Sequence, residues 1–141
     1  MAGTLARRAA GVLPRRYIGY AGASVIALGV DVVTFLLVLS LSAPPAPSAA
    51  LGYASGILVH WLITSRLVFA DRTGAVGTSR RNLQGVAFAA SALLGLFLTW
   101  GVVAFAVTLG VPAVVGKALA IVVSFQAVWI VRNRLVFAAS R

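Results

Sequence analysis

The chain has 141 residues, of which 61% are hydrophobic and 10% are charged, and its mean hydropathy is +1.03. A soluble domain of this composition would leave large apolar surfaces in water, so we expect an all-α integral membrane protein. The net charge of +10 comes mostly from arginines at the ends of apolar segments, and the positive-inside rule explains that placement without a nucleic-acid partner.

Four apolar runs are each long enough to cross about 30 Å of hydrocarbon, which takes about 20 residues. The chain begins with a basic lead over residues 1–16, in which Pro14 is expected to interrupt any helix. A first two-helix repeat follows over residues 17–69. It contains spans at 17–41 and 48–63, separated by a proline-rich turn.

The second half of the chain is organised in the same way. A connector over residues 70–82 leads into a second two-helix repeat over residues 83–137. This repeat has spans at 83–109 and 113–131 around a short Gly-Val-Pro turn, and a tail over residues 138–141 closes the chain. The sequence therefore predicts four transmembrane helices.

An internal duplication relates the two halves. The segment from Trp61 to Ala70 returns as the segment from Trp129 to Ala138, each time at the end of an apolar run and with the ending Arg-Leu-Val-Phe-Ala. The same offset of 68 residues pairs Pro44 with Pro112, far outside the motif. Each half is therefore expected to bring one basic, aromatic-flanked patch to a membrane surface.

The positive charges predict the orientation in the membrane. Four arginines lie in the lead, four between residues 66 and 82, and three near the C-terminus, whereas the two short turns have none. This asymmetry places both termini and the connector in the cytosol and the turns outside. Each repeat then begins and ends on the same side, so the repeats are parallel, and a cleft between them is the natural place for a ligand.

Two charged residues fall inside the predicted spans, Asp31 in the first and Lys117 in the fourth. A charge at such a depth costs a few kcal/mol, so each must face a partner or water, and the long lysine side chain allows a pair between the two. Three interpretations stay open. The pair is purely structural, or Lys117 extends to the outer interface, or the residues line a polar substrate path with contributions from Gln126 and His60. His60 also fits a hydrogen-bonded packing residue.

Small or polar residues recur every fourth position on the second and fourth spans: Ser48, Gly52, Gly56, His60 and Thr64, then Gly116, Ala120 and Ser124. This spacing puts each set on one helix face and lets backbones approach closely. The face serves either the bundle within the chain or a dimer interface.

Arg66 and Arg134 stand at equivalent positions of the duplicated motif. Each follows a tryptophan that is expected at the level of the lipid headgroups, Trp61 or Trp129. The planar guanidinium suits phosphate oxygens, and repetition of the whole motif favours phosphate binding over a simple topology anchor. Arg132 and Asn133 add a charge and an amide to the second copy, so we expect that copy to bind an anion more strongly.

The sequence shows no enzyme signature. Its two carboxylates, Asp31 in a span and Asp71 in a loop, cannot form a general acid/base pair, and no phosphate-binding glycine loop is present. Because the chain has no cysteine and a single histidine, no metal site and no cofactor are expected. The functions that remain are transport or scaffolding in the membrane.

An acid in the first span, a lysine after the Gly-x-Pro turn, and the endings Arg66-Leu-Val-Phe69 and Arg134-Leu-Val-Phe137 resemble the GtrA-like family over residues 16–137. Thr64 and Ser65 depart from the asparagine that usually precedes the basic residue. The resemblance implies a bacterial inner-membrane protein that flips polyprenyl-phosphate-linked monosaccharides to the outer leaflet, for cell-wall or surface polysaccharide synthesis.

In that light the arginines become phosphate clamps, and the sugar path is formed by polar residues of the spans: Asp31, Lys117, Gln126 and His60. The alternative is a non-transporting scaffold that recruits a polyprenyl-phosphate glycosyltransferase. A small multidrug-type exporter is less favoured, because the charge bias of such proteins is weak. Four helices enclose little volume for a lipid-linked sugar, so a homodimer is also expected.

Overall fold

The computed structural model describes residues 2–68 and 79–138, and all regular structure within them is helical. The helices are α1 (Ala2–Ser40), α2 (Pro45–Ile63), the π-helix η1 (Thr64–Val68), α3 (Ser79–Thr108) and α4 (Ala113–Ala138). Four segments are long and apolar enough to span a membrane: Ile18–Ser40, Pro45–Leu67, Gly85–Thr108 and Ala113–Val131. The prediction of an all-α, multi-pass membrane protein is confirmed.

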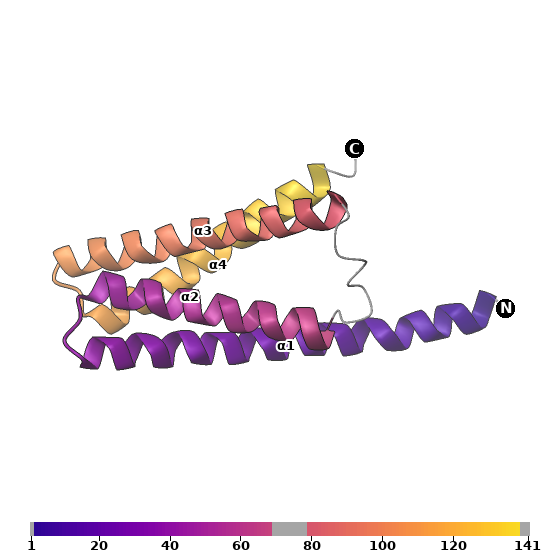
Figure 1. The fold of residues 1–141 in the computed structure, drawn as a ribbon, viewed down its shortest axis with the longest axis horizontal. Helices are drawn as coiled ribbons and strands as arrows, with labels where there is room; N and C mark the ends of the chain where they lie inside the picture. The colour runs from indigo at the N-terminus through magenta and orange to yellow at the C-terminus, as the bar shows by residue number, and fades with distance from the viewer. Residues whose placement is uncertain (1, 69–78, 139–141) are drawn as a thin grey trace.

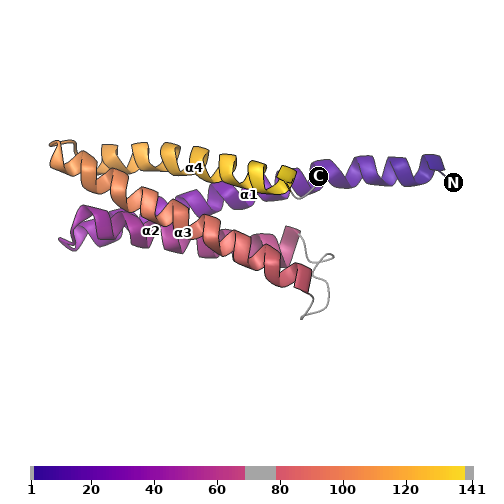
Figure 2. The same cartoon turned by 90° about the horizontal axis from the view of Figure 1, so that it is seen from above.

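The helices form two hairpins. α1 packs along α2 and α3 along α4, and α2 also packs along α3. Both interhelical turns lie at one end of the bundle, which we call the turn end, and we call the opposite end the terminal end (Figure 1). From the turn end the two hairpins diverge toward the terminal end (Figure 1). In both views α1 continues well beyond the other helices (Figure 2).

Proline has less effect on helix boundaries than the sequence suggests. α1 runs through Pro14, so the predicted interruption there is wrong. The missing N–H frees one carbonyl, and because Pro14 precedes the apolar span, water can satisfy that carbonyl. α2 begins at Pro45 rather than after Pro47, because a proline in the first helical turn lacks only an N–H that would have no helical partner.

The two turns occupy equivalent positions at the offset of 68 residues. α1 ends at Ser40 and α3 at Thr108. Two residues further on, Ser42 has φ 64° and Gly110 has φ 79°, so both turns reverse through a left-handed residue. Glycine takes this conformation freely, whereas a serine there is less favourable by about 1–2 kcal/mol. The same backbone reversal is thus retained with different side chains.

A hydrophobic core joins the hairpins close to the turn end. It takes one buried residue from each helix: Phe35, Ala49, Val103 and Ala120. In the terminal half of the α1–α2 hairpin the buried positions are small or polar, including Ala23, His60 and Thr64. The apolar contact between hairpins is therefore strongest near the turns, and polar groups are buried farther from them.

Candidate functional site

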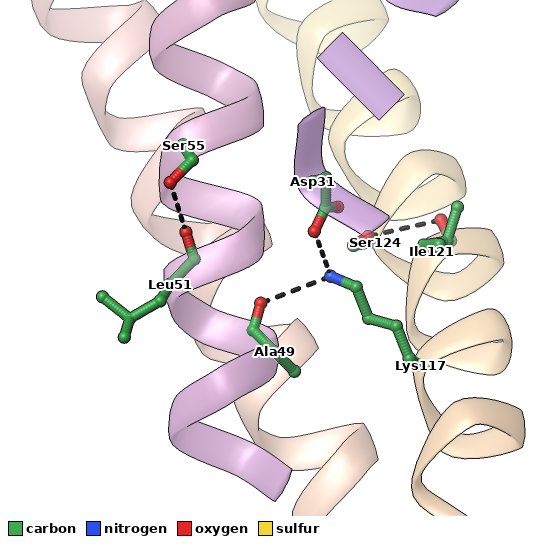
Figure 3. A network of polar contacts seen from close by, with 7 residues as sticks. All are labelled: Asp31, Ala49, Leu51, Ser55, Lys117, Ile121 and Ser124. Carbon is green, nitrogen blue, oxygen red and sulfur yellow. Dashed lines mark hydrogen bonds and ion pairs between the residues drawn. The ribbon is translucent and has the colours of Figure 1, made fainter. Parts of the chain in front are cut away.

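Asp31 and Lys117 form a buried ion pair in the middle of the bundle. Lys117 Nζ lies 2.5 Å from Asp31 Oδ1 and donates a hydrogen bond of 3.3 Å to the carbonyl oxygen of Ala49 (Figure 3). The lysine side chain is 3% exposed and the aspartate side chain 9%. The two residues thus form the pair that the sequence allows. Each compensates the desolvation of the other, and together they connect α4 to α1 and α2.

The lysine side chain extends away from the turn end. Lys117 enters α4 about one turn from the start of that helix, whereas Asp31 lies about two and a half turns from the end of α1. The ammonium also lies 5.8 Å from the ring centroid of Phe35, within the range of a cation–π interaction. The interpretation that Lys117 extends to the outer interface is therefore wrong, since its charge points into the protein.

Two glycines of α2 make room for Asp31. A Cβ at Gly52 would lie 2.5 Å from the backbone oxygen of Asp31 and 2.6 Å from its Oδ1. At Gly56 it would lie 2.7 Å from the backbone oxygen of Ala27. Because the glycines lack side chains, α2 can approach α1 closely at the depth of the ion pair. The small-residue face of the second span therefore serves the bundle within the chain.

A second polar cluster lies on the same α1–α2 interface, nearer the terminal end. Ser24 Oγ lies 3.2 Å from His60 Nε2, and the Tyr20 ring meets the His60 ring edge-on at a centroid distance of 5.1 Å. Ser24 precedes Asp31 by about two turns, so His60 belongs to a separate cluster. Tyr20 and Ser24 were missed by sequence reasoning, although their spacing with Ala27 and Asp31 marks one face of α1.

One polar residue, Gln126, lies differently from expectation, and another, Thr99, was not expected to be part of the site. Gln126 is exposed on α4, so the structure does not bring it to the ion pair, and buried Ser124 takes the inward position. Thr99 of α3 was not anticipated, although it stands 68 residues after Asp31 and so at its equivalent position. It is 1% exposed, and its hydroxyl has no hydrogen-bond partner within the described residues.

The two motif arginines lie toward the terminal end, and both are exposed. Arg66 is part of the π-helix η1, whereas Arg134 continues α4 as a regular α-helix. At the start of η1, Thr64 Oγ1 donates a 2.7 Å hydrogen bond to the carbonyl of His60. The preceding tryptophans, Trp61 and Trp129, are about half exposed. Arg132 and Asn133 belong to α4, but their side chains lie outside the described part of the structure.

No group of three or more histidine or acidic side chains that could hold a metal ion occurs in the described part of the chain. The polar chemistry there consists of the central ion pair, the histidine cluster and the exposed arginines. Four spanning helices with a buried ion pair and a basic end define a small multi-pass membrane protein with polar groups at three depths.

The family model described as GtrA/DPMS, transmembrane domain, matches residues 19–137. The chain belongs to this family, which confirms the resemblance seen in the sequence. Comparison with curated proteins and with solved structures gave no match. Family membership associates the chain with the handling of polyprenyl-phosphate-linked sugars at a membrane.

Proposed function

We propose that this protein is a flippase rather than an enzyme. It moves a polyprenyl-phosphate-linked monosaccharide from the cytosolic to the outer leaflet of a bacterial inner membrane, for cell-wall or surface polysaccharide synthesis. The observation that carries the proposal is a pair of exposed arginines, Arg66 and Arg134, at equivalent positions of a duplicated motif toward the terminal end. A topology signal requires only positive charge and not the repetition of the whole motif.

The polar groups supply suitable partners for each part of such a lipid. Arg66 and Arg134 receive the phosphate through charge-assisted, bidentate hydrogen bonds, with Arg132 and Asn133 adding to the second copy. Sugar hydroxyls then meet neutral and charged hydrogen-bonding groups along α1 and α2: Tyr20, Ser24, His60 and Asp31. The polyprenyl chain stays in the bilayer, next to the many apolar side chains exposed on the outer faces of the helices.

The test measures flipping of a labelled polyprenyl-phosphoryl sugar in proteoliposomes. Arg66→Ala and Arg134→Ala are each expected to lower the initial rate at least tenfold, because a bidentate phosphate contact is lost. Arg81→Ala, which removes a positive charge from the first turn of α3 outside the motif, serves as the matched control and retains most of the rate. Unchanged rates in both motif variants would overturn the proposal.

The two arginines are not expected to contribute equally. Because Arg132 and Asn133 replace Thr64 and Ser65 of the first copy, the second copy offers more donors to a phosphate. Arg134→Ala is therefore expected to raise the substrate concentration for half-maximal rate more than Arg66→Ala does. Equal shifts in the two variants would show that the neighbouring residues do not take part in binding.

Orientation is part of the proposal, since the arginines must face the leaflet where the lipid-linked sugar is made. Thr78, in the connector and outside the described residues, can be replaced by cysteine in a chain that has none. A membrane-impermeant maleimide is expected to label Thr78→Cys only after the cells are opened. Labelling of intact cells would place the terminal end outside and reverse the direction of transport.

The extension of α1 favours a second candidate function. This helix continues from Ile18 back to Ala2, well past the other helices, and contains four arginines and no acid over that length (Figure 1). Such a basic helix could dock an acidic surface of a polyprenyl-phosphate glycosyltransferase and make the protein a scaffold. This function is favoured if reconstituted protein moves no lipid while removal of residues 2–16 abolishes co-purification of a glycosyltransferase.

We also propose that two copies of the chain associate. Since the α2 face with Gly52 and Gly56 is already covered by α1, a dimer would have to use another surface. Native mass spectrometry of gently extracted protein tests this proposal and the ligand together. A mass of two chains with bound polyprenyl-phosphate-linked sugar is expected, and a single chain without lipid would contradict both statements.

A further inference from the structure

The ion pair joins α1 and α4, two helices that do not pack along each other in the described part of the chain. α2, in contrast, packs along α3. Lys117 of α4 reaches Asp31 of α1 through its full side chain (Figure 3). The hairpins are thus joined by apolar packing on one side and by an ion pair on the other. Separation of the two charges would remove the polar contact between α1 and α4.

The duplicated architecture does not itself require this pair. At the offset of 68 residues, Asp31 corresponds to Thr99, and Lys117 corresponds to Ala49, which is fully buried. On the α2–α3 side the same positions are therefore occupied by uncharged residues and the helices pack directly. A buried ion pair is seldom more stable than well-packed apolar residues of the same volume. The presence of charge on one side only points to a role beyond holding the bundle together.

The position of the pair suits an incoming anion. The hydrophobic core that includes Phe35 lies one turn beyond Asp31 in the direction of the turn end. In the other direction the hairpins diverge (Figure 1), and that end has the exposed arginines Arg66 and Arg134. Apart from Lys117, every arginine and lysine lies outside the apolar spans or, in the case of Arg66, next to the last residue of one. An anion that leaves the arginines therefore has one cation inside the bundle to move to.

We propose that Lys117 is an internal phosphate-binding position, and that the carboxylate of Asp31 occupies it until the phosphate of a lipid-linked sugar replaces it. This inference rests on the proposed function. A phosphodiester between a polyprenyl chain and a sugar has one negative charge, as the carboxylate does, so the exchange leaves the charge facing Lys117 unchanged. The displaced carboxylate accepts hydrogen bonds from the sugar hydroxyls, which offset part of its desolvation cost.

The exchange would also couple binding to movement. Once the lysine binds phosphate, the ion pair between α1 and α4 is lost, and the hairpins stay joined by the packing of α2 against α3 and by the apolar core near the turn end. Because the lysine has one positive charge, a phosphodiester matches it better than a pyrophosphate, whose added charge would stay uncompensated in a low dielectric. The site therefore selects for singly charged headgroups.

Binding to the purified full-length protein tests the exchange. Three lipids of equal chain length serve as probes: a polyprenyl-phosphoryl sugar, a polyprenyl pyrophosphate and the uncharged polyprenol. Inorganic phosphate is a fourth probe, which distinguishes a headgroup site from a free-anion site. The variants are Asp31→Asn, which removes the competing carboxylate, and the double variant Asp31→Asn with Lys117→Met, which keeps similar shapes without either charge. Each is made with and without Arg66→Ala, Arg132→Ala and Arg134→Ala.

In Asp31→Asn the phosphodiester lipid is expected to bind about tenfold more tightly than in the wild type and to raise the melting temperature by more. The double variant is expected to lose this gain, and polyprenol to bind all forms alike. Equal affinity of Asp31→Asn and the double variant for the phosphodiester lipid would overturn the proposal. A tenfold gain for inorganic phosphate alone would also overturn it, because the position would then bind free phosphate and not the lipid.

If the Asp31→Asn variant folds poorly, the double variant still tests the proposal. That variant, combined with the three arginine substitutions, is expected to bind phosphodiester lipid no better than polyprenol, whereas the arginine substitutions alone leave a phosphate preference of several-fold. Absence of any preference in the latter protein would overturn the internal site. Since these are binding measurements, a protein that binds in this way but moves no lipid would overturn the flippase and leave the internal site standing.

Discussion

The two hairpins share a framework but differ in their chemistry. Buried positions of α1 recur as buried positions of α3 at the offset of 68 residues: Ala27 with Gly95, Asp31 with Thr99, and Phe35 with Val103. The hairpins also reverse direction at equivalent left-handed residues. Yet each hairpin supplies one half of the ion pair, and only the first has a histidine cluster. The packing positions are thus equivalent in the two hairpins, whereas the charges are distributed unequally among them.

Removal of one charge of the ion pair is expected to lower the stability of the protein more than any other substitution considered below. Lys117→Met leaves Asp31 buried and unpaired, so we expect the free energy of unfolding to fall by about 3–5 kcal/mol. Denaturant titration of the purified protein in detergent, followed by tryptophan fluorescence, measures the change. Addition of Asp31→Asn to this variant is expected to restore most of the loss. A single variant as stable as the wild type would show that the pair is dispensable for folding.

Gly52 tests whether the close approach of α2 to α1 is needed. In the second hairpin the equivalent residue, Ala120, already has a methyl group and is fully buried. In the first hairpin the same methyl group would meet the backbone and carboxylate oxygens of Asp31, so Gly52→Ala is expected to cost about 1–3 kcal/mol. The control is Gly101→Ala, where nothing lies within 4 Å and helix propensity favours alanine by up to about 1 kcal/mol. Equal melting temperatures would contradict the expected difference between the hairpins.

Much of the fold could be predicted from the sequence because the bilayer restricts the structures that an apolar chain can adopt. Apolar runs of about 20 residues can only be spanning helices, and two isolated charges at depth must find partners. That argument allowed the pairing of Asp31 with Lys117, which the structure shows, even though the two residues are far apart in the chain. The direction of the lysine side chain could not be predicted, because it depends on how α1, α2 and α4 come together.

Other parts of the site could not be predicted from the sequence, because they depend on the tertiary structure. Gln126 was assigned to the path by its polarity, but it lies about 200° around α4 from buried Ser124 and so on an exposed face. The π-helix that contains Arg66 has no simple sequence signature, since the equivalent residues of the second copy stay α-helical. The cluster of Tyr20 and Ser24 with His60 required a pairing of α1 with α2 in the correct register.

The smallest change in stability is expected for a substitution at Thr99. Its direction is opposite to that expected for the substitutions in the ion pair and at Gly52. Thr99 is as buried as its equivalent Asp31, but its hydroxyl has no hydrogen-bond partner in the described part of the chain. Thr99→Val keeps the shape and removes a polar group that is desolvated without compensation, so stability should stay the same or rise by about 1 kcal/mol. A thermal unfolding experiment in detergent measures this change.

A flipping assay of the same Thr99→Val variant decides whether the Thr99 hydroxyl has a role in transport. A stable variant with normal transport would show that the Thr99 hydroxyl is not needed for function. A stable variant with slow transport would instead make the Thr99 hydroxyl a contact for the sugar, since a packing role cannot account for lost activity in a protein of unchanged stability. Both hairpins would then contribute polar groups to one path, and the asymmetry would lie only in the charges.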